Sequence, residues 1–240
     1  MAQTELTWLG HGSFRVDTPE GQRIYIDPWL DGPTCPSHER EPGRVDAILL
    51  THAHDDHLGQ TVALYERFQC TVLAPWELRW WLARQGLPES MEEALNRGGS
   101  RRLGDVTVTF TDARHSSSTP DGTTVGEACG IVIAADAGEK IYFAGDTCAF
   151  MDMQLIGRLH RPDLAVLPIG DHVTMGPREA ALALELLGVQ RCVPAHYGTA
   201  PFMTGTPEEF IRHVDGAAEV TVLAPGESTF VTPRKIGDDA

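Results

Sequence analysis

The chain has 240 residues, a length that favours one large domain over two small ones. Hydrophobic residues make up 42% of it and charged residues 22%, an ordinary globular composition that argues against long disordered tracts. Lys and Arg number 19 against 34 Asp and Glu, a formal net charge of −15, which disfavours nucleic acid and anionic membrane surfaces as partners.

The predicted elements begin with short strands. Alternating apolar residues over 6–26 predict a β-meander, and the Pro- and Gly-rich stretch 31–43 predicts an irregular loop. Residues 47–50 form a continuous apolar run, which indicates a strand covered on both faces. The elements predicted after it are helices over 61–68, from Pro75 and over 177–187, and strands over 71–74, 106–110, 130–134, 141–143, 164–167, 192–193, 221–223 and 229–231.

The order of these elements predicts the layers of the fold. Strands grouped towards both ends with helices between them favour two sheets packed face to face with helices outside, although the periodicity also permits a three-layer α/β fold. The sequence has no repeat and no linker rich enough in Gly, Pro or Ser to divide it. We therefore expect residues 1–240 to form a single domain.

Four potential metal ligands follow the strand predicted over 47–50. In the segment Thr-His-Ala-His-Asp-Asp-His they are His52, His54, Asp56 and His57. Residues two apart in an extended segment project to the same side, so His52 and His54 can bind one ion, while Asp56 and His57 face a second where the chain turns into a helix. Imidazole and carboxylate suit zinc and similar divalent ions. A lone histidine would more often cap a helix or lie hydrogen-bonded in the core, but this density of ligands predicts a metal site.

Three further residues of ligand type stand where a predicted strand gives way to a loop. They are His115, Asp146 and His196. Singly, each is as well explained by a helix cap or a satisfied polar group. As a set they complete two ion sites at strand ends, where α/β proteins place functional groups.

The order HxHxDH, then His, Asp and His, resembles the metallo-β-lactamase superfamily. Within it the chain is most similar to the uncharacterised metal-dependent hydrolases related to ascorbate-6-phosphate lactonases. The segments that carry this closer resemblance are Trp8-Leu9-Gly10-His11, Ala113-Arg114-His115-Ser116-Ser117, Phe143-Ala144-Gly145-Asp146-Thr147, Leu167-Pro168-Ile169-Gly170-Asp171, Thr174-Met175-Gly176-Pro177 and Pro194-Ala195-His196-Tyr197.

The resemblance implies an α/β fold, namely a four-layer αββα sandwich of two mixed β-sheets with helices on the outer faces. It also implies a metal pair at one edge of the sandwich. Carried over residue by residue, one ion takes His52, His54 and His115, the other takes Asp56, His57 and His196, and Asp146 bridges them. The implied cofactor is two divalent metal ions per chain, with zinc favoured and manganese or nickel as alternatives, although some relatives bind a single ion.

Four other residues are candidates for orienting the ligands or lining the substrate pocket. His11 ends a strand in one of the resembling segments, which favours a pocket role. Asp27 and Asp171 each either accept the other ring N–H of a metal-binding histidine or stabilise a turn, and the family analogy favours the orienting role for Asp27. His172 is either a substrate contact or a loop residue; relatives more often have Asn or a bulky residue there.

The predicted function is a metal-dependent hydrolase that uses a metal-activated water on a small-molecule ester, lactone or phosphoester. We expect Asp56 to share the proton of that water and Tyr197 to donate a hydrogen bond to the developing oxyanion. One alternative is a phosphodiesterase or nuclease of the same superfamily, which the acidic balance disfavours. The other is a metal-binding protein without catalysis, which the full set of ligands disfavours.

Signals outside the ligand motifs are weaker. The three arginines between residues 97 and 102 form a basic cluster, which is a solvated loop unless a substrate phosphate or carboxylate needs an anchor. Trp76, Trp80 and Trp81 mark a helix face that packs in the core or forms the subunit interface of a homo-oligomer, with a hydrophobic lid as the less favoured alternative.

The number and spacing of the cysteines and the composition of the first residues indicate the cellular compartment. The cysteines are odd in number and scattered, as expected of reduced thiols. No apolar run approaches the roughly 20 residues that a membrane helix needs, and the first residues lack the features of an export signal. We predict a cytoplasmic protein that acts on a small-molecule substrate, with no membrane or nucleic-acid partner.

Overall fold

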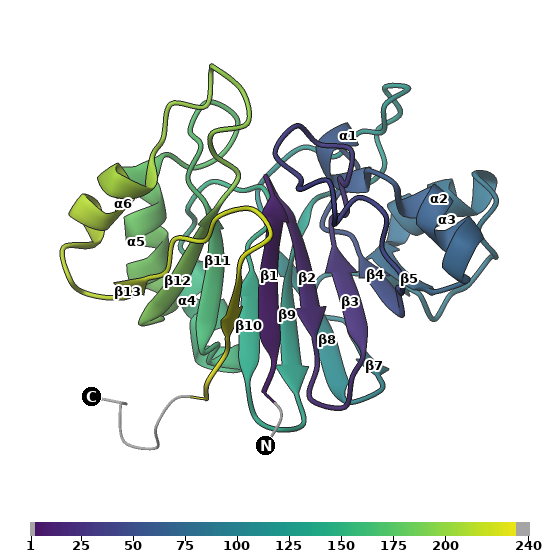
Figure 1. The fold of residues 1–240 in the computed structure, drawn as a ribbon, viewed down its shortest axis with the longest axis horizontal. Helices are drawn as coiled ribbons and strands as arrows, with labels where there is room; N and C mark the ends of the chain where they lie inside the picture. Colours follow the sequence, from purple (N-terminus) through teal and green to yellow (C-terminus); the bar gives the residue numbers. More distant parts are fainter. Residues whose placement is uncertain (1–2, 234–240) are drawn as a thin grey trace.

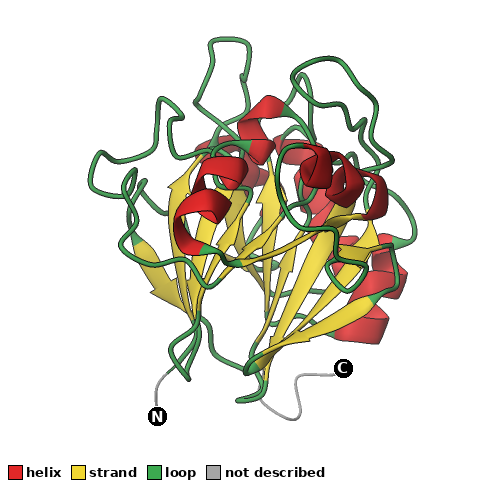
Figure 2. Cartoon of the chain, turned by 90° about the vertical axis from the view of Figure 1, so that its right-hand side faces the viewer, coloured by secondary structure: helices red, strands yellow, loops and turns green. Residues whose placement is uncertain are grey.

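Two seven-stranded β-sheets packed face to face form the centre of the protein, as seen in the computed structural model, which describes residues 3–233 (Figures 1 and 2). The strand orders are β14-β1-β2-β3-β4-β5-β6 and β13-β12-β11-β10-β9-β8-β7. The strands are β1 (Glu5–Gly10), β2 (Ser13–Asp17), β3 (Arg23–Ile26), β4 (Ala47–Leu49), β5 (Thr71–Pro75), β6 (Ala94–Leu95), β7 (Ser100–Leu103), β8 (Val106–Asp112), β9 (Cys129–Ala135), β10 (Lys140–Phe143), β11 (Leu164–Pro168), β12 (Arg191–Ala195), β13 (Glu219–Val220) and β14 (Ser228–Phe230). The helices are α1 (Asp55–Leu58), α2 (Thr61–Phe68), α3 (Trp76–Arg84), α4 (Met153–His160), α5 (Pro177–Leu187) and α6 (Pro207–Val214).

Both sheets are mixed, and their strand directions bring several carboxyl ends to one edge. In the first sheet β1, β2 and β3 pair antiparallel and β3, β4 and β5 pair parallel, so β1 runs the same way as β3 to β5. In the second sheet β8, β9 and β10 pair antiparallel and β10, β11 and β12 pair parallel. The residues after β1 and β12 are in contact, since the amide of His196 donates to the carbonyl of His11 at 3.0 Å. The carboxyl ends of both sets of strands therefore meet at the same edge of the sandwich.

Three apolar clusters fill the spaces between the layers. The first lies between the two sheets and includes Leu49 and Val166. The second joins the first sheet to α2 and α3 and includes Ile48, and the third joins the second sheet to α4, α5 and α6. Adjacent residues Ile48 and Leu49 point to opposite faces of β4, which explains the continuous apolar run there. The layers thus run helix, sheet, sheet, helix, and the predicted αββα sandwich is confirmed.

Some elements differ from the sequence-based prediction. The strand predicted over 221–223 is wrong, because β13 lies at Glu219–Val220 and its pairing with β12 ends where Cys192 faces Val220. The sequence analysis also missed α4, α6, β6 and β7, although Thr206, Pro207 and Glu209 form a helix-start pattern for α6. No helix within residues 3–233 is long and apolar enough to cross a membrane.

Candidate metal centre

The candidate ligands come from segments that are far apart in sequence and meet at the shared strand edge. His11 follows β1, and His52 and His54 follow β4, while Asp56 and His57 lie on α1, His115 follows β8, Asp146 follows β10 and His196 follows β12. Helix α1 marks this edge in Figure 1, above the ends of the strands. The fold therefore brings together residues from five separate stretches of sequence.

Three histidines form the first ligand group. Nε2 of His52 lies 3.0 Å, and Nε2 of His115 lies 3.2 Å, from Nδ1 of His54. One ligand atom from each ring lies within 4.8 Å of the other two. Burial lowers the pKa of His54 and His115, and it lowers that of fully buried His52 well below its ordinary value. Neutral rings whose nitrogens converge in this way are a donor set that suits a divalent cation.

Thr51 orients His52. The hydroxyl of Thr51 donates to Oδ2 of Asp27 at 2.6 Å, and its oxygen lies 2.9 Å from Nδ1 of His52. Because the hydroxyl hydrogen is already used, the ring donates from Nδ1, and Nε2 remains unprotonated towards the other histidines. The sequence analysis missed Thr51; its position directly before His52 at the end of a buried strand is the signal that points to it.

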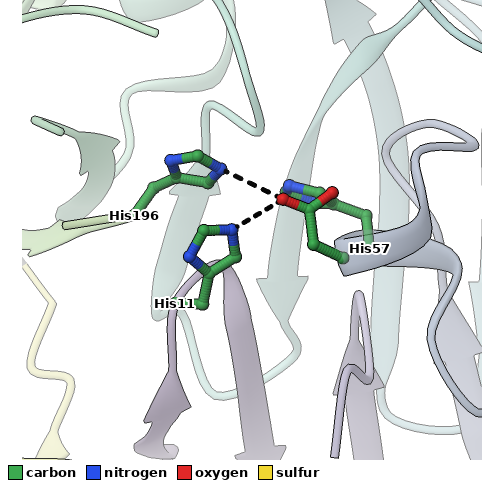
Figure 3. A group of neighbouring side chains, drawn as sticks. His11, His57 and His196 are labelled. Atoms are coloured by element: carbon green, nitrogen blue, oxygen red, sulfur yellow. Dashed lines mark hydrogen bonds and ion pairs between the residues drawn. The ribbon is translucent and has the colours of Figure 1, made fainter. Parts of the chain in front are cut away.

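Asp56, His57 and His196 form the second ligand group together with His11. Figure 3 shows the rings of His11, His57 and His196 gathered around one point, with dashed lines marking the contacts of His11 and His196 with Asp56. Nε2 of His11 lies 2.9 Å, and Nε2 of His196 lies 3.8 Å, from Oδ2 of Asp56. His11 thus contacts a candidate ligand directly.

Asp146 lies between the two groups. Its Oδ2 is 3.2 Å from Nε2 of His196 and 3.6 Å from Nε2 of His115, and its Oδ1 is 3.3 Å from Nε2 of His57. Burial would raise the pKa of Asp146, but the neighbouring His196 and His57 hold it well below its ordinary value. One ionised carboxylate therefore faces ring nitrogens of both groups, the position that the family resemblance gives to a bridging ligand.

Asp27 holds His57 from the opposite side. Its Oδ2 lies 2.7 Å from Nδ1 of His57, and its Oδ1 accepts the Thr51 amide at 2.8 Å. With Nδ1–H donated to Asp27, Nε2 of His57 faces Asp146. Carboxylates orient metal-binding histidines in this way, so the geometry favours the orienting role over the turn-stabilising one for Asp27.

The charge and hydrogen bonding of these residues fit a cation. Burial alone would lower the pKa of His57, but Asp146 and Asp27 raise it well above its ordinary value, so the surroundings favour positive charge. Among the described residues, Nε2 of His57 and both ring nitrogens of His196 are buried without a hydrogen-bond partner. Buried polar atoms without partners are rare, and metal coordination is a partner suited to imidazole nitrogen.

The backbone at this edge is held in an uncommon conformation. His11, Asp27 and His196 have left-handed φ angles of 52°, 46° and 54°. Such angles are unfavourable for residues other than glycine, and they persist where the surrounding structure fixes them, often at functional sites. Each of these residues turns directly after a strand and presents its side chain to the ligand groups.

The contacts of three predicted site residues lie outside the two ligand groups. Asp171 is exposed and its Oδ1 accepts the amide of His172 at 2.9 Å, so it stabilises a turn rather than orienting a metal-binding histidine. The ring of His172 packs on Phe202 with the centroids 5.1 Å apart. Tyr197 is half-buried, and its ring stacks on Trp8 at 5.2 Å.

An open cavity of about 290 Å³ lies above the ligand groups. The residues that line it are His54, Asp56, His115, Ser116, Asp146, Val173, Phe202 and Met203. Tyr197 is not among them, and burial raises the pKa of its hydroxyl to about 12. The expectation that Tyr197 contacts a developing oxyanion is therefore not supported by its position.

The fold and this set of ligands define a metallo-β-lactamase-type hydrolase, and the profile of the beta-lactamase superfamily domain matches residues 22–197. The chain is 48% identical over 232 residues to a UPF0173 metal-dependent hydrolase of Rubrobacter xylanophilus, covering 93% of this chain and 95% of that protein. The protein belongs to this family of metal-dependent hydrolases within the superfamily.

Solved structures agree with this assignment. Igni18, a metallo hydrolase of Ignicoccus hospitalis, superposes with a TM-score of 0.85 at 34% identity, covering 97% of this chain and all 100% of that one. An isothiocyanate hydrolase from Delia radicum gut bacteria superposes with a TM-score of 0.70 at 20% identity, covering 94% of this chain and 98% of that one. The second likeness concerns the fold alone.

The cysteines lie outside both ligand groups. All five are free; Cys35, Cys70, Cys129 and Cys192 are buried, and Cys148 is exposed. Burial raises the pKa of Cys35 and of Cys70 to about 11, so these thiols stay protonated and shielded. We expect iodoacetamide to label one thiol in the native protein and all five after denaturation, as counted by mass spectrometry.

We also expect replacement of the cysteines by Ser or Ala to cost some stability but to leave metal binding intact. Loss of metal in a variant that still folds would reveal a thiolate ligand.

Proposed function

We propose that the protein hydrolyses a small-molecule ester, lactone or phosphoester with two divalent ions, zinc being favoured. His52, His54 and His115 would hold one ion and Asp56, His57 and His196 the other, with Asp146 shared. The observation that supports this assignment is the Asp146 carboxylate, whose oxygens lie 3.2–3.6 Å from ring nitrogens of both groups. When bound, such ions lower the pKa of water towards neutrality and polarise the oxygen of an ester or phosphoryl group.

Asp56 is the residue that we assign to orienting the nucleophilic water. Burial would raise its pKa, but the hydrogen bond from His11 and the charge of His57 hold it below its ordinary value. Its Oδ2 accepts from His11, which leaves Oδ1 to accept from a water, and Asp56 lines the cavity. An ionised carboxylate of this kind accepts a hydrogen bond from water and aims its oxygen, rather than storing the proton.

His11 supports Asp56 in this role. Burial, as the largest cause, lowers the pKa of His11 to about 4, so the ring is neutral at pH 7. A carboxylate can only accept, so Nε2–H of His11 donates to Asp56, and Nδ1 accepts from the Thr199 hydroxyl at 2.8 Å. The hydrogen bonds from Thr199 to His11 and from His11 to Asp56 therefore fix the orientation of the Asp56 carboxylate.

In place of Tyr197, we assign the oxyanion contact to Ser116, the hydroxyl residue that lines the cavity.

Metal content and hydrolysis test this proposal together. Elemental analysis of protein purified without chelator should find about two divalent ions per chain, as in two-metal hydrolases. Chelation should abolish hydrolysis in a screen of lactones, carboxylic esters and phosphodiesters, and added metal should restore it. Chelation should also lower the melting temperature, because bound metal stabilises the native state. A chain that stays metal-free after incubation with zinc, manganese and nickel would overturn the proposal.

A small-molecule substrate in the cytoplasm is part of the same proposal. The net charge of −15 gives the electrostatic term for nucleic-acid binding the wrong sign. We expect no complex with duplex DNA or RNA at physiological salt in a fluorescence anisotropy titration. A micromolar complex under those conditions would favour a phosphodiesterase or nuclease instead.

A further inference from the structure

One wall of the cavity above the candidate ligands is apolar. It is formed by Val173, Phe202 and Met203, while Asp56 and Asp146 are the carboxylates of the lining. Val173 is 44% exposed and Phe202 is 50% exposed, although both are large hydrophobic residues. Exposed apolar surface that borders a pocket commonly marks a binding site.

Backbone hydrogen bonds fix the position of this wall. The amide of Asp171 donates to the carbonyl of Met175 at 2.9 Å, and the carbonyl of Asp171 accepts the amide of Val173 at 2.7 Å. This tight turn needs left-handed φ angles of 66° at Asp171 and 60° at His172. The His172 ring then packs on Phe202, which connects the turn to the loop after β12. The wall is thus preformed, and His172 belongs to its support.

The cavity lining that the structure describes gives an anion no permanently charged cation. Among the described residues that line it there is no Lys or Arg, whereas Asp56 and Asp146 are acidic. The arginines that the sequence suggested as an anchor are paired elsewhere: Arg97 with Asp112 and Glu127, Arg101 with Glu92, and Arg102 with Asp136. Arg97 lines a different cavity, beside Pro75 and Phe110. A phosphate or carboxylate remote from the reacting bond would therefore lack the charged partner that such groups need.

We infer, on the basis of the proposed hydrolysis, that the substrate is an uncharged carboxylic ester or lactone whose apolar group lies against Val173, Phe202 and Met203. The cavity volume of about 290 Å³ is near the lower end for ligand pockets, which suits a small substrate. In the reaction, the water oxygen bonds to the acyl carbon and the bond from that carbon to the alkoxy oxygen breaks. One water proton passes to the alkoxide, so the products are an acid and an alcohol, joined in one molecule when the substrate is a lactone.

A series of p-nitrophenyl esters from acetate to octanoate tests the apolar wall in the metal-loaded protein. We expect kcat/KM to rise about twofold to fourfold for each methylene until the wall is covered. Phe202→Ala should lower the octanoate-to-acetate ratio of kcat/KM about tenfold, because the apolar surface of the ring is lost. Phe230→Ala is the matched control, since Phe230 is also exposed but lies on β14, and it should leave the ratio unchanged.

The metal-loaded protein also tests whether the apolar wall disfavours a charged group on the substrate. Mono-p-nitrophenyl suberate matches the octanoate ester in length but ends in a carboxylate, and we expect its kcat/KM to be at least about tenfold lower. A suberate ester that is hydrolysed as well as the octanoate, or a ratio that is insensitive to Phe202→Ala, would overturn the inference while leaving the proposed hydrolysis in place.

A binding measurement separates the inference from turnover. Calorimetric titration with 2-octanone and 2-butanone, which cannot be hydrolysed, should show tighter binding of the longer ketone, and Phe202→Ala should abolish the difference. This result without hydrolysis of any ester would support the apolar site and count against the proposed reaction. Equal affinity for both ketones would count against the apolar site whichever substrates are turned over.

Discussion

Asp146→Ala is expected to abolish hydrolysis and to weaken metal binding at both ligand groups together. The carboxylate contacts His57, His115 and His196, so its removal leaves the facing nitrogens of two groups without their shared negative charge. Removing one partner of a buried charge pair costs about 3–5 kcal/mol of stability. A loss of similar size in the free energy of metal binding would lower the affinity about a thousandfold. Titration of metal-free protein with zinc, together with the assay that the substrate screen provides, measures both effects.

Two further variants make this test specific. Asp152→Ala is the matched control, because Asp152 lies on the same segment but is 67% exposed and pairs loosely with Arg114 at 3.8 Å. Asp56→Asn should weaken metal binding less at the three-histidine group than at the second ligand group. The reason is that Asp56 contacts His11 and His196, which both belong to the second group. Retention of both metals at wild-type affinity in Asp146→Ala would refute the bridging position, and undiminished turnover in Asp56→Asn would remove Asp56 from the reaction.

Asp27→Asn is expected to reduce metal affinity and the rate of hydrolysis by about 10-fold to 100-fold, although Asp27 acts only through His57 and Thr51. Asp27 is 1% exposed, and its two oxygens accept from His57 and from the amide and hydroxyl of Thr51. An asparagine tolerates the left-handed backbone at this position and keeps the volume, so the substitution tests the carboxylate itself. The NH2 group of the asparagine would face the groups of Thr51 and His57 that donate to Asp27. His57 would then be free to take its other tautomer.

Metal affinity measured by competition with a chelator reports this effect independently of turnover. A loss of about 1–3 kcal/mol in the free energy of unfolding should accompany it, because a buried hydrogen-bonded group loses its partner. Asp31→Asn serves as the control, since the carboxylate of Asp31 accepts from Gln60 in an exposed hydrogen bond. Unchanged metal affinity in Asp27→Asn would show that His57 needs no orienting carboxylate.

The ligand-rich segment and the buried strand before it can be recognised from residue order alone. His52, His54, Asp56 and His57 are close in sequence and follow a strand, so their proximity depends on local geometry that spacing encodes. The continuous apolar run at residues 47–50 likewise required a strand covered on both faces, as Ile48 and Leu49 show by packing into different clusters. The family resemblance then supplied the sandwich, which the two sheets confirm.

Residues with similar local sequence patterns are distinguished by their long-range contacts in the folded protein. Asp27 and Asp171 allowed the same two interpretations, but Asp27 is buried against His57 whereas Asp171 is exposed in a turn. The two aspartates differ in burial and in hydrogen-bond partner, and the partner of Asp27 is distant in sequence. A local sequence pattern contains no information about such a partner. The same reason applies to Tyr197, which packs on Trp8. The apolar wall of the cavity likewise exists only because two loops from different parts of the chain meet there, where long-range packing, rather than propensity, fixes which side chains line the cavity.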